Sequence, residues 1–569
     1  MKSRLVGLLG LGFVLGCAAG LAAQQQAPAP SATFTSRAEL VLVPVHVQRH
    51  GEHVAALKQD SFTLLQDGKP QKISVFEEIR TTTKRLQRVQ VPPGEFTNEL
   101  EGDANAARYT VIAIDRLNTT TMDMHRLRDG LLAFLKQATD SGEPIRLLAI
   151  NLTNIQIIQD FTTDPKVLAA ALLRMETPSG KTQPEPDQAN QDDTVAIFTD
   201  IANGLEAAGQ SAAGMRKALS AMQSQSDEMT AFADRSSRIN SLEALQQVAM
   251  SLSGFPGRKS VVWASSGYPF TGVGTELAGL GVNQHWVGGS NFSHAGEAMM
   301  LDEYTTHLLS AANIAVYPVD VRGVVNTAFD SMNPSRVAPG NRAALQARDQ
   351  DITTTFLHLA DATGGKPCYG RENVSGCFKD ALDDERDYYV VGYYVDHDKT
   401  QPGWHKISVK VAEPGVSVRS RTGFLLASFS PNQTKNLDVK LELNSWLSGV
   451  GLPFRGRWLP PVPKGEKESV GLELRIASSA NLVAPDQPSL NLEVAALARR
   501  ADGSVAAQFG QHVERSLPPD AIAQIQHEGV TYHNALELPP GKYLVRIVIR
   551  DNNTGRMGAL TNLLTVDSN

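Results

Sequence analysis

Cysteine is scarce in this sequence, with three residues in 569: Cys17, Cys368 and Cys377. No Cys-x-x-Cys pair and no His-Glu-x-x-His spacing occurs, so the usual signatures of a zinc site are missing. The glycine-rich stretch 272–289 lacks a phosphate-binding Gly-Lys-Ser/Thr, and Ser265-Ser266-Gly267 is not a Gly-x-Ser-x-Gly nucleophile elbow. The sequence therefore offers no convincing catalytic constellation, and we do not expect an enzyme.

Positive charge and long apolar runs are also in short supply. The chain carries 53 Lys and Arg against 60 Asp and Glu, a net charge of −7, without a Lys/Arg-rich run. An acidic balance repels phosphate backbones, so nucleic acid is excluded as a partner. After the N-terminus no stretch has the roughly 18 apolar residues of a transmembrane helix. The length itself indicates about three or four domains.

The N-terminus has the order of a secretory signal: Met-Lys-Ser-Arg, an apolar run over 5–15, and small residues up to Ala23. We therefore expect residues 1–23 to be a signal peptide, 24–36 a polar linker, and the protein to be periplasmic, at the cell surface or secreted. Two kinds of processing compete. One is ordinary cleavage near 20–23, and the other is lipidation at Cys17, because Val14-Leu15-Gly16-Cys17 resembles the bacterial lipobox.

Export makes the other two cysteines informative. An oxidising compartment allows Cys368 and Cys377 to form a disulfide, which would close a loop of about ten residues. A metal-binding or redox thiol pair is the alternative, but it lacks both the Cys-x-x-Cys spacing and a nearby histidine cluster. We therefore expect a disulfide.

Patterning divides the rest of the chain. Residues 37–81 predict a small β unit with a period-2 valine strand and an Asp-Gly hairpin turn at 67–68. The polar segment 82–107 is interpreted as a connector. Residues 107–386 alternate strands and helices, which favours a mostly parallel sheet covered on both faces, with an insertion at about 177–239.

Strands again dominate after the alternating region. Residues 387–426 predict strands that complete the N-terminal β unit, since that unit cannot bury its apolar face alone. Residues 427–569 predict a second β-sandwich, with strands expected at 437–443, 469–475, 490–498, 543–550 and 560–566. The predicted fold class is thus α/β plus β: a doubly wound, Rossmann-like domain flanked by β-sandwich domains.

Residues 109–120, at the start of the alternating region, are the stretch that most favours a functional site. A short apolar strand, 109–114, ends there in the acidic and hydroxyl-rich loop that contains Asp115 and Thr119. In open α/β sheets ligands bind at the carboxyl ends of the strands, because loops and helix N-termini converge there. Asp115 is therefore the first candidate for a site residue.

Several blocks, in order, resemble the von Willebrand factor A-related proteins of the acidobacterial type. They cover about residues 38–425 and are the following: Asp60-Ser-Phe-x-Leu-Leu-Gln-Asp-Gly-Lys-Pro-Gln71, Asp115-x-Leu-x-Thr119, Phe255-Pro-Gly-Arg-Lys-Ser-Val-Val-Trp-Ala-Ser-Ser-Gly-Tyr-Pro269, Ala360-Asp-Ala-Thr-Gly-Gly365, Tyr388-Tyr-Val-Val-Gly-Tyr393 and Arg421-Thr-Gly-Phe424. The resemblance implies a doubly wound A-domain.

The family often holds a divalent cation, with Asp-x-Ser-x-Ser after the first strand and an Asp after the fourth. In this chain Asp115 and Thr119 match, but Leu117 replaces the first Ser and Ser266 stands in place of the later Asp. The resemblance implies two alternatives. One is a weakened site for Mg²⁺ or another divalent cation made by Asp115, Thr119 and Ser266, with Asn118 as a further candidate ligand. The other is a structural remnant in which Asp115 hydrogen-bonds loop amides.

These expectations lead to a hypothesis for the function. We expect an exported, non-catalytic protein that binds a protein partner, in adhesion or envelope interaction, at the loops around Asp115. One alternative is a hydrolase or chaperone-like accessory that acts on envelope substrates. Another is an envelope scaffold in which the two β domains bind and the α/β domain is a spacer.

Overall fold

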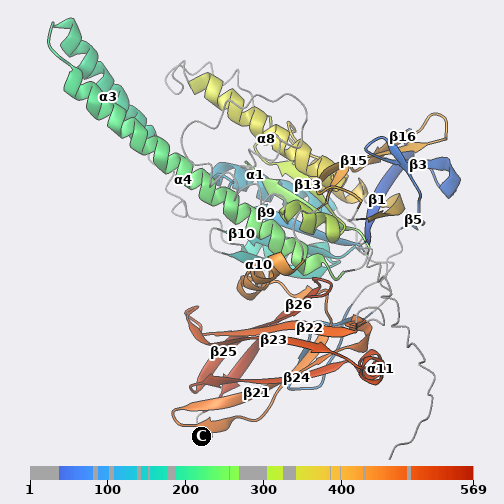
Figure 1. Cartoon of the computed structure of the whole chain (residues 1–569). Helices are drawn as coiled ribbons and strands as arrows, with labels where there is room; N and C mark the ends of the chain where they lie inside the picture. Colours follow the sequence, from blue (N-terminus) through green and yellow to red (C-terminus); the bar gives the residue numbers. More distant parts are fainter. Residues whose placement is uncertain are drawn as a thin grey trace, which may run out of the picture.

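The computed structural model describes residues 38–80, 87–101, 108–137, 143–151, 154–175, 188–255, 257–267, 304–324, 341–384, 386–396, 399–426, 431–483 and 488–567. The described chain is a mixed α/β protein with several antiparallel β-sheets. Figure 1 shows an α/β region with a small β-sandwich beside it and a larger β-sandwich below. The expected signal peptide, the linker and Cys17 lie outside the described residues.

The small sandwich joins two segments that are far apart in the sequence. Its strands are β1 (Ala38–Arg49), β2 (Glu52–His53), β3 (Phe62–Gln66), β4 (Lys69–Gln71), β5 (Val75–Arg80), β14 (Asp387–Asp396), β15 (Gly403–Val411), β16 (Ser417–Ser420) and β17 (Gly423–Leu426). One sheet has the order β16-β1-β14-β5 and the other β17-β15-β3-β4. Strands from 387–426 therefore pair with strands from 37–81, and the valine face of β1 is buried between the two sheets.

The central sheet has the strand order β11-β10-β9-β12-β13. Its strands are β9 (Tyr109–Asp115), β10 (Ile145–Ile150), β11 (Ile155–Thr162), β12 (Lys259–Ser265) and β13 (Ile314–Asp320). All neighbouring pairs are parallel except β10 and β11. Every residue of β9, β10, β12 and β13 is buried, as expected for parallel strands covered on both faces.

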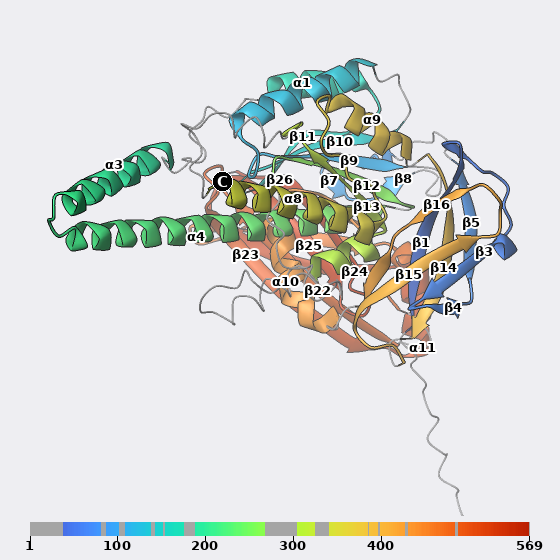
Figure 2. The same cartoon turned by 90° about the horizontal axis from the view of Figure 1, so that it is seen from above.

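Helices pack on both faces of this sheet, and Figure 2 shows it between α1 with α9 on one side and α4 with α8 on the other. The helices are α1 (Thr121–Gln137), α2 (Pro165–Arg174), α4 (Ala213–Leu252), α8 (Asn341–Thr363) and α9 (Ser375–Asp384), together with a short helix over 304–311. The start of α2 is fixed by local residues: Asp164 caps it by accepting a hydrogen bond from the Lys166 amide, and Pro165 is its first residue.

The expected insertion contains a helical arm. Helices α3 (Gln188–Ala207) and α4 form a hairpin that projects from the body of the protein (Figure 1). Helix α4 is 40 residues long, so it continues past the expected end of the insertion at about residue 239. Its C-terminal end packs against the sheet through Leu245, Val248 and Leu252.

In the large sandwich two sheets pack against each other and share one apolar core. Its strands are β18 (Gly449–Val450), β19 (Phe454–Trp458), β20 (Val462–Lys464), β21 (Lys467–Ile476), β22 (Ser489–Arg499), β23 (Val505–Ser516), β24 (Val530–Leu538), β25 (Gly541–Asp551) and β26 (Met557–Val566), with helix α11 (Pro519–Glu528) at its edge. One sheet has the order β18-β26-β25-β22-β23. In the other, β21 pairs with β19, β20 and β24.

The interpretation of 82–107 as a simple connector is wrong. Strand β7 (Glu95–Thr97) pairs with β19 of the large sandwich, and β6 (Gln87–Arg88) pairs with β8 (Leu100–Glu101). The buried Asn98 side chain fixes this crossing, because its Nδ2 donates to the carbonyls of Gly449 and Leu452 and its Oδ1 accepts from the Phe454 amide. The segment is therefore built into the C-terminal part of the fold.

The strand predicted at 437–443 is also wrong, because those residues lie in helix α10 (Pro431–Asn444). In 437–443 apolar and polar residues alternate, so residues four positions apart, such as Leu437 and Leu441, are both apolar. This spacing also fits one face of a helix, and in α10 Leu441 is buried and Leu437 is half-buried. The acidic residues at the same spacing, Asp438 and Glu442, are buried too, and they pair with Arg550 and Arg546 of β25.

The expected disulfide between Cys368 and Cys377 is confirmed, with an S–S distance of 2.03 Å. It ties the segment beside β13 to helix α9, since the Asp320 amide donates to the Cys368 carbonyl. Among the described residues, no helix combines the length and the apolar character that a membrane crossing requires.

Candidate functional site

The candidate site lies at the carboxyl edge of the central sheet. Asp115 ends β9, Ser265 ends β12 and Asp320 ends β13, and because these strands are parallel their ends meet at one edge. The loop after β9 leads directly into helix α1, which begins at Thr121. The sequence therefore places acidic and hydroxyl side chains from three strands next to one another.

Asp115 is fully buried and is surrounded by hydrogen-bond donors. Its Oδ1 accepts from the backbone amides of Leu117 and Asn118, each at 3.1 Å. Its Oδ2 accepts from Asn118 Nδ2 at 2.9 Å and from Trp263 Nε1 at 3.3 Å, and Ser265 Oγ lies 2.9 Å from the same oxygen. Four N–H groups and a hydroxyl thus occupy about all the lone-pair directions of one carboxylate.

Two opposing effects act on the pKa of Asp115. Burial raises the pKa, because the charged form loses its hydration, and the hydrogen bonds from Asn118, Ser265 and Leu117 act in the opposite direction. No Lys or Arg side chain is among the donors to this carboxylate in the described structure. The loop is therefore closed around a carboxylate by neutral donors.

The other two predicted ligands are close by, but they bond elsewhere. The Thr119 hydroxyl accepts a hydrogen bond from the Ser266 amide at 3.2 Å. The Ser266 hydroxyl donates to Asp123 Oδ2 at 2.8 Å. The structure thus brings Asp115, Thr119 and Ser266 to the same edge, while the hydroxyl of Ser266 faces a second carboxylate rather than Asp115.

That second carboxylate, Asp123, is a site residue that the sequence reasoning missed. Thr120 precedes helix α1, its hydroxyl accepts from the Asp123 amide at 3.2 Å and it donates to Asp123 Oδ2 at 2.9 Å. Thr120 thus caps the helix through its hydroxyl, and the capping-box sequence that marks it, Thr-x-x-Asp before an apolar-periodic helix, is readable in the sequence. Asp123 is therefore fixed by the start of the helix.

Arg126 supplies the positive charge at this edge. Its Nη1 lies 3.0 Å from Asp123 Oδ1 and also donates to the carbonyls of Val321 and Arg322 in the loop after β13. A guanidinium thus crosses from α1 to the β13 loop and neutralises Asp123. The third acidic residue, Asp320, is neutralised by Arg322, with Nη2 2.7 Å from Oδ2.

These contacts fit a divalent cation poorly. Mg²⁺ requires free oxygen lone pairs in a small octahedral shell, whereas the oxygens of Asp115 accept from N–H groups and Asp123 faces a guanidinium. Among the described residues, no group of three or more His, Cys, Asp or Glu side chains is arranged to hold a metal ion. A bound cation would first have to displace several of these hydrogen bonds.

Large apolar side chains stand exposed beside Arg126. Met122, one turn before it on α1, is 71% exposed, and Val324, after β13, is 59% exposed. Gly323 lies against the Arg126 side chain, so the β13 loop carries Val324 into the neighbourhood of the guanidinium. Arg126 itself keeps 39% of its side chain accessible. The edge thus offers an exposed surface that combines apolar side chains with an arginine.

Comparisons with known proteins add little to this picture. No protein-family model matches the chain, and no curated protein matches it. Among solved structures, the chain is matched to the crystal structure of a beta-glucuronidase from Bacteroides uniformis with 13% identity and a TM-score of 0.14. That match covers 31% of this chain and 19% of the beta-glucuronidase chain. A likeness this weak carries no argument about fold or function.

Proposed function

We propose that this chain is an exported, non-catalytic protein that binds a protein partner through a domain of the von Willebrand factor A type whose metal site has degenerated. The blocks of residues that resemble that family support the proposal. A mostly parallel sheet with helices on both faces is compatible with such a domain. Recognition takes place at the carboxyl edge of the central sheet, in adhesion or another interaction at the cell envelope.

The observation that carries this proposal is that the Asp115 loop, which is held by its own hydrogen bonds, lies beside a rim of exposed side chains formed by Met122, Val324 and Arg126. Hydrogen bonds within the chain already saturate Asp115, so its role is to hold the loop in shape. Met122, Val324 and Arg126 lie on the outside, where a partner can reach them. Exposed apolar side chains around an arginine are typical of the centres of protein interfaces.

Capture of partners from an envelope extract tests the proposal. The wild-type chain is compared with the double variant Met122→Glu and Val324→Glu, whose native side chains are exposed enough for the fold to tolerate the change. The matched control is Leu173→Glu in the last turn of α2, which is 57% exposed and is not one of the rim residues. The bound proteins are identified and quantified by mass spectrometry.

We expect the rim variant to lose a specific partner that the wild type and the Leu173→Glu control both retain. The loss follows because two buried carboxylates would face an apolar contact on the partner. Retention of every partner by the rim variant contradicts the proposal and moves recognition to the β domains, in line with a scaffold role. Repeating the capture with a chelator separates metal-dependent binding from the direct contact proposed for this rim.

A further inference from the structure

The C-terminal sandwich carries a second surface, which is independent of the carboxyl edge. Strand β23 is the last strand of its sheet and pairs only with β22 among the described strands. In the described chain its backbone makes no other backbone hydrogen bond outside that pairing. An unpaired strand edge presents a row of N–H and C=O groups, which is a ready template for another strand.

The first half of this edge lacks the usual protection. Residues 505–511 read Val-Ala-Ala-Gln-Phe-Gly-Gln and contain no charged residue and no proline, the two commonest devices against edge pairing. Charged residues return only at Glu514 and Arg515. Near Gln511 the neighbouring strand β24 comes close, because the Tyr532 hydroxyl donates to Gln511 Oε1 at 2.7 Å. The open part of the edge is therefore Val505–Gly510.

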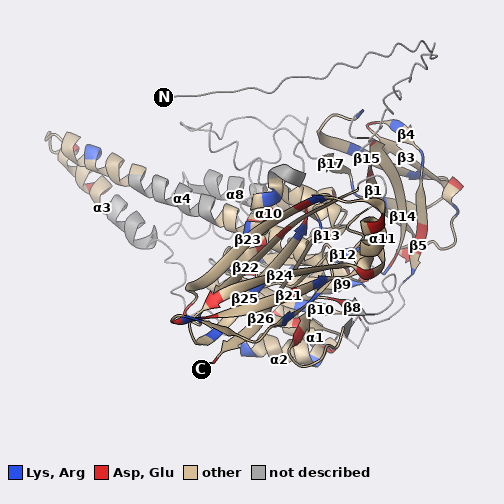
Figure 3. Ribbon diagram, turned by 60° about the horizontal axis from the view of Figure 1, so that its bottom comes forward, with Lys and Arg blue, Asp and Glu red and all other residues tan. Residues whose placement is uncertain are grey.

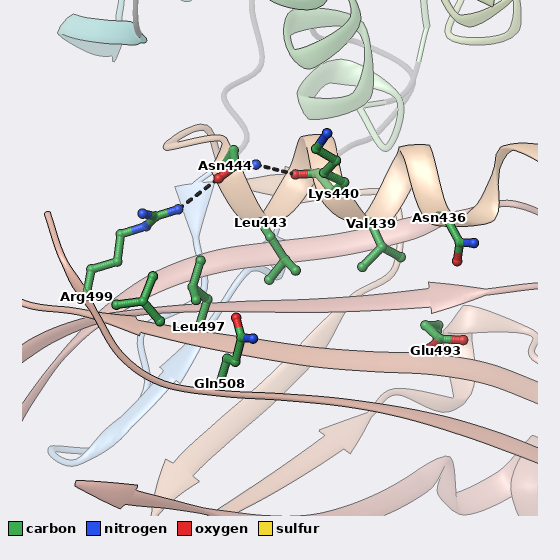
Figure 4. A pocket seen from close by; sticks show the side chains of 10 residues that line it. Asn436, Val439, Lys440, Leu443, Asn444, Glu493, Leu497, Arg499 and Gln508 are labelled. Carbon is green, nitrogen blue, oxygen red and sulfur yellow. Dashed lines mark hydrogen bonds between the residues drawn. The ribbon is translucent and has the colours of Figure 1, made fainter.

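A groove runs beside this edge, between helix α10 and strands β22 and β23 (Figure 4). It has a volume of about 410 Å³ and an apolar floor made by Val439, Leu443, Leu497 and Val505. A bulge in the β22–β23 pairing sets Val505 opposite Arg499, and Val505 remains 48% exposed. The groove thus has room for a side chain of an incoming segment.

Gly510 keeps the outer face of β23 open. It pairs with Ala495, and therefore lies on the same face as Leu497 and Gln508. A Cβ atom built on Gly510 would meet no other atom within 4 Å. The outer face of β23 is thus unobstructed at Gly510, next to the groove.

The charge of the groove selects what can enter it. Glu493 is paired with Lys435 at 2.8 Å. Arg499, at the other end, bonds neutral oxygens: Nη2 donates to Asn444 Oδ1 at 2.8 Å and Nη1 to the Gly503 carbonyl at 3.4 Å. Lys440 is exposed at the border of the groove. Elsewhere on this sandwich basic and acidic residues are interspersed (Figure 3), so the cationic end of the groove is a local feature.

We propose that the β23 edge and this groove bind an extended segment of a partner protein as an added β-strand. An apolar residue of the segment enters the open side of the groove beside Gln508, and an acidic residue two positions along lies beside Val505, where the long Arg499 side chain can reach it. This spacing matches because Gln508 and Val505 lie opposite Leu497 and Arg499, which are two residues apart on one face of β22. Backbone hydrogen bonds to β23 supply affinity, while the groove and Arg499 supply specificity.

The test uses the full chain and a synthetic peptide of about nine residues, long enough for one strand. The peptide alternates valine with threonine and carries one glutamate; its counterpart has lysine in place of glutamate. Binding is followed by fluorescence polarisation, and amide hydrogen exchange locates the protected strand. The test variant is Gly510→Glu, which places a negative charge on the face next to the groove, where it repels the glutamate of the peptide. Its control is Gln524→Glu on exposed helix α11.

We expect the glutamate peptide to bind at least about tenfold more tightly than the lysine peptide and to protect amides in Val505–Gly510. Gly510→Glu should weaken binding of the glutamate peptide by about tenfold or more, and Gln524→Glu should leave it unchanged. Absence of strand protection, or equal binding by Gly510→Glu, overturns the proposal. Protection of β23 that appears without peptide and grows with protein concentration also overturns it, because the edge would then pair with a second copy of the chain.

Discussion

Two groups of buried carboxylates in this protein are satisfied in different ways. Asp115 is surrounded by neutral donors that come mostly from its own loop. Asp438 and Glu442 of α10 instead meet two arginines of β25 that lie more than 100 positions further along the chain. Asp438 also accepts from the Tyr304 hydroxyl of the α/β region, so this ionic cluster joins two parts of the molecule. One arrangement shapes a loop, and the other holds domains together.

The largest expected effect comes from breaking the ionic cluster. Asp438→Ala leaves the fully buried Arg550 without its counter-charge, so we expect the free energy of unfolding to fall by about 3–5 kcal/mol in urea denaturation. The double variant Asp438→Leu with Arg550→Met removes both charges and should recover most of this loss. An equal loss in the single and double variants would show that the packing of α10, rather than the ion pair, is responsible.

The second prediction concerns the neutral cluster at Asp115. Asp115→Ala removes the acceptor of the backbone N–H groups of Leu117 and Asn118 inside the protein, and we expect it to destabilise by about 2–4 kcal/mol in the same measurement. Asp115→Asn keeps one carbonyl acceptor and should recover about half. The corresponding Asp438→Asn should recover little, because a neutral amide does not compensate Arg550. Similar behaviour of the two Asn variants would remove the distinction between the clusters.

The buried His46 differs from both groups of carboxylates, because in the part of the chain that the structure describes neither neutral groups nor charged groups of opposite sign bond to its ring. His46, at the contact between the small sandwich and the α/β region, has no hydrogen-bond partner for either ring nitrogen among the described residues. Burial, reinforced by the nearby Arg419 and Arg258, holds the pKa of His46 well below 6.5. Below pH 6.5 the unfolded chain therefore binds a proton that the folded chain does not, so stability falls as the pH drops.

We expect His46 to contribute a loss of about 1.4 kcal/mol for each pH unit below 6.5. The measurement compares urea denaturation of wild type and His46→Phe at pH 7.5 and pH 5.5. His46→Phe keeps an aromatic ring beside Tyr388 and should show a smaller loss on acidification. An identical pH dependence in the two proteins would mean that His46 is protonated in the folded state.

The smallest effect is expected at the N-terminal cap of α1. Thr120→Ala removes the hydroxyl that binds the Asp123 amide and carboxylate, and it should destabilise by about 1 kcal/mol. Thr121→Ala, at the neighbouring exposed position, is the control and should change stability by less than about 0.5 kcal/mol. Equal thermal shifts for the two variants would show that the cap does not fix the start of the helix.

Features made by residues close together in the sequence could be predicted, whereas features that depend on residues far apart in the sequence could not. The Asp67-Gly68 turn is local, and both residues have the positive φ values, 50° and 78°, that the dipeptide predicts. The cap at Asp164 and the apolar strand β9 are local as well. Helix α10 was mistaken for a strand, because only its distant partners on β25 show that Asp438 and Glu442 share a buried face.

In the candidate site, too, the local features could be predicted and the long-range ones could not. The position of Asp115 at the end of a strand, and its proximity to Thr119 and Ser266, could be predicted from strand ends in a parallel sheet. Asp123 could have been found from its capping-box sequence. The contact of Arg126 with the carbonyls of the β13 loop could not, because that loop comes from a strand nearly 200 positions away.

Calorimetric titration of Mg²⁺ and Mn²⁺ into the wild-type chain and Asp115→Asn decides whether the carboxyl edge is a hydrogen-bonded recognition surface with no resident cation. We expect only heats of dilution for both proteins, because the Asp115 oxygens already accept four N–H groups. Saturable heat in the wild type that disappears in Asp115→Asn would contradict it, and would make Asp115 a metal ligand after all.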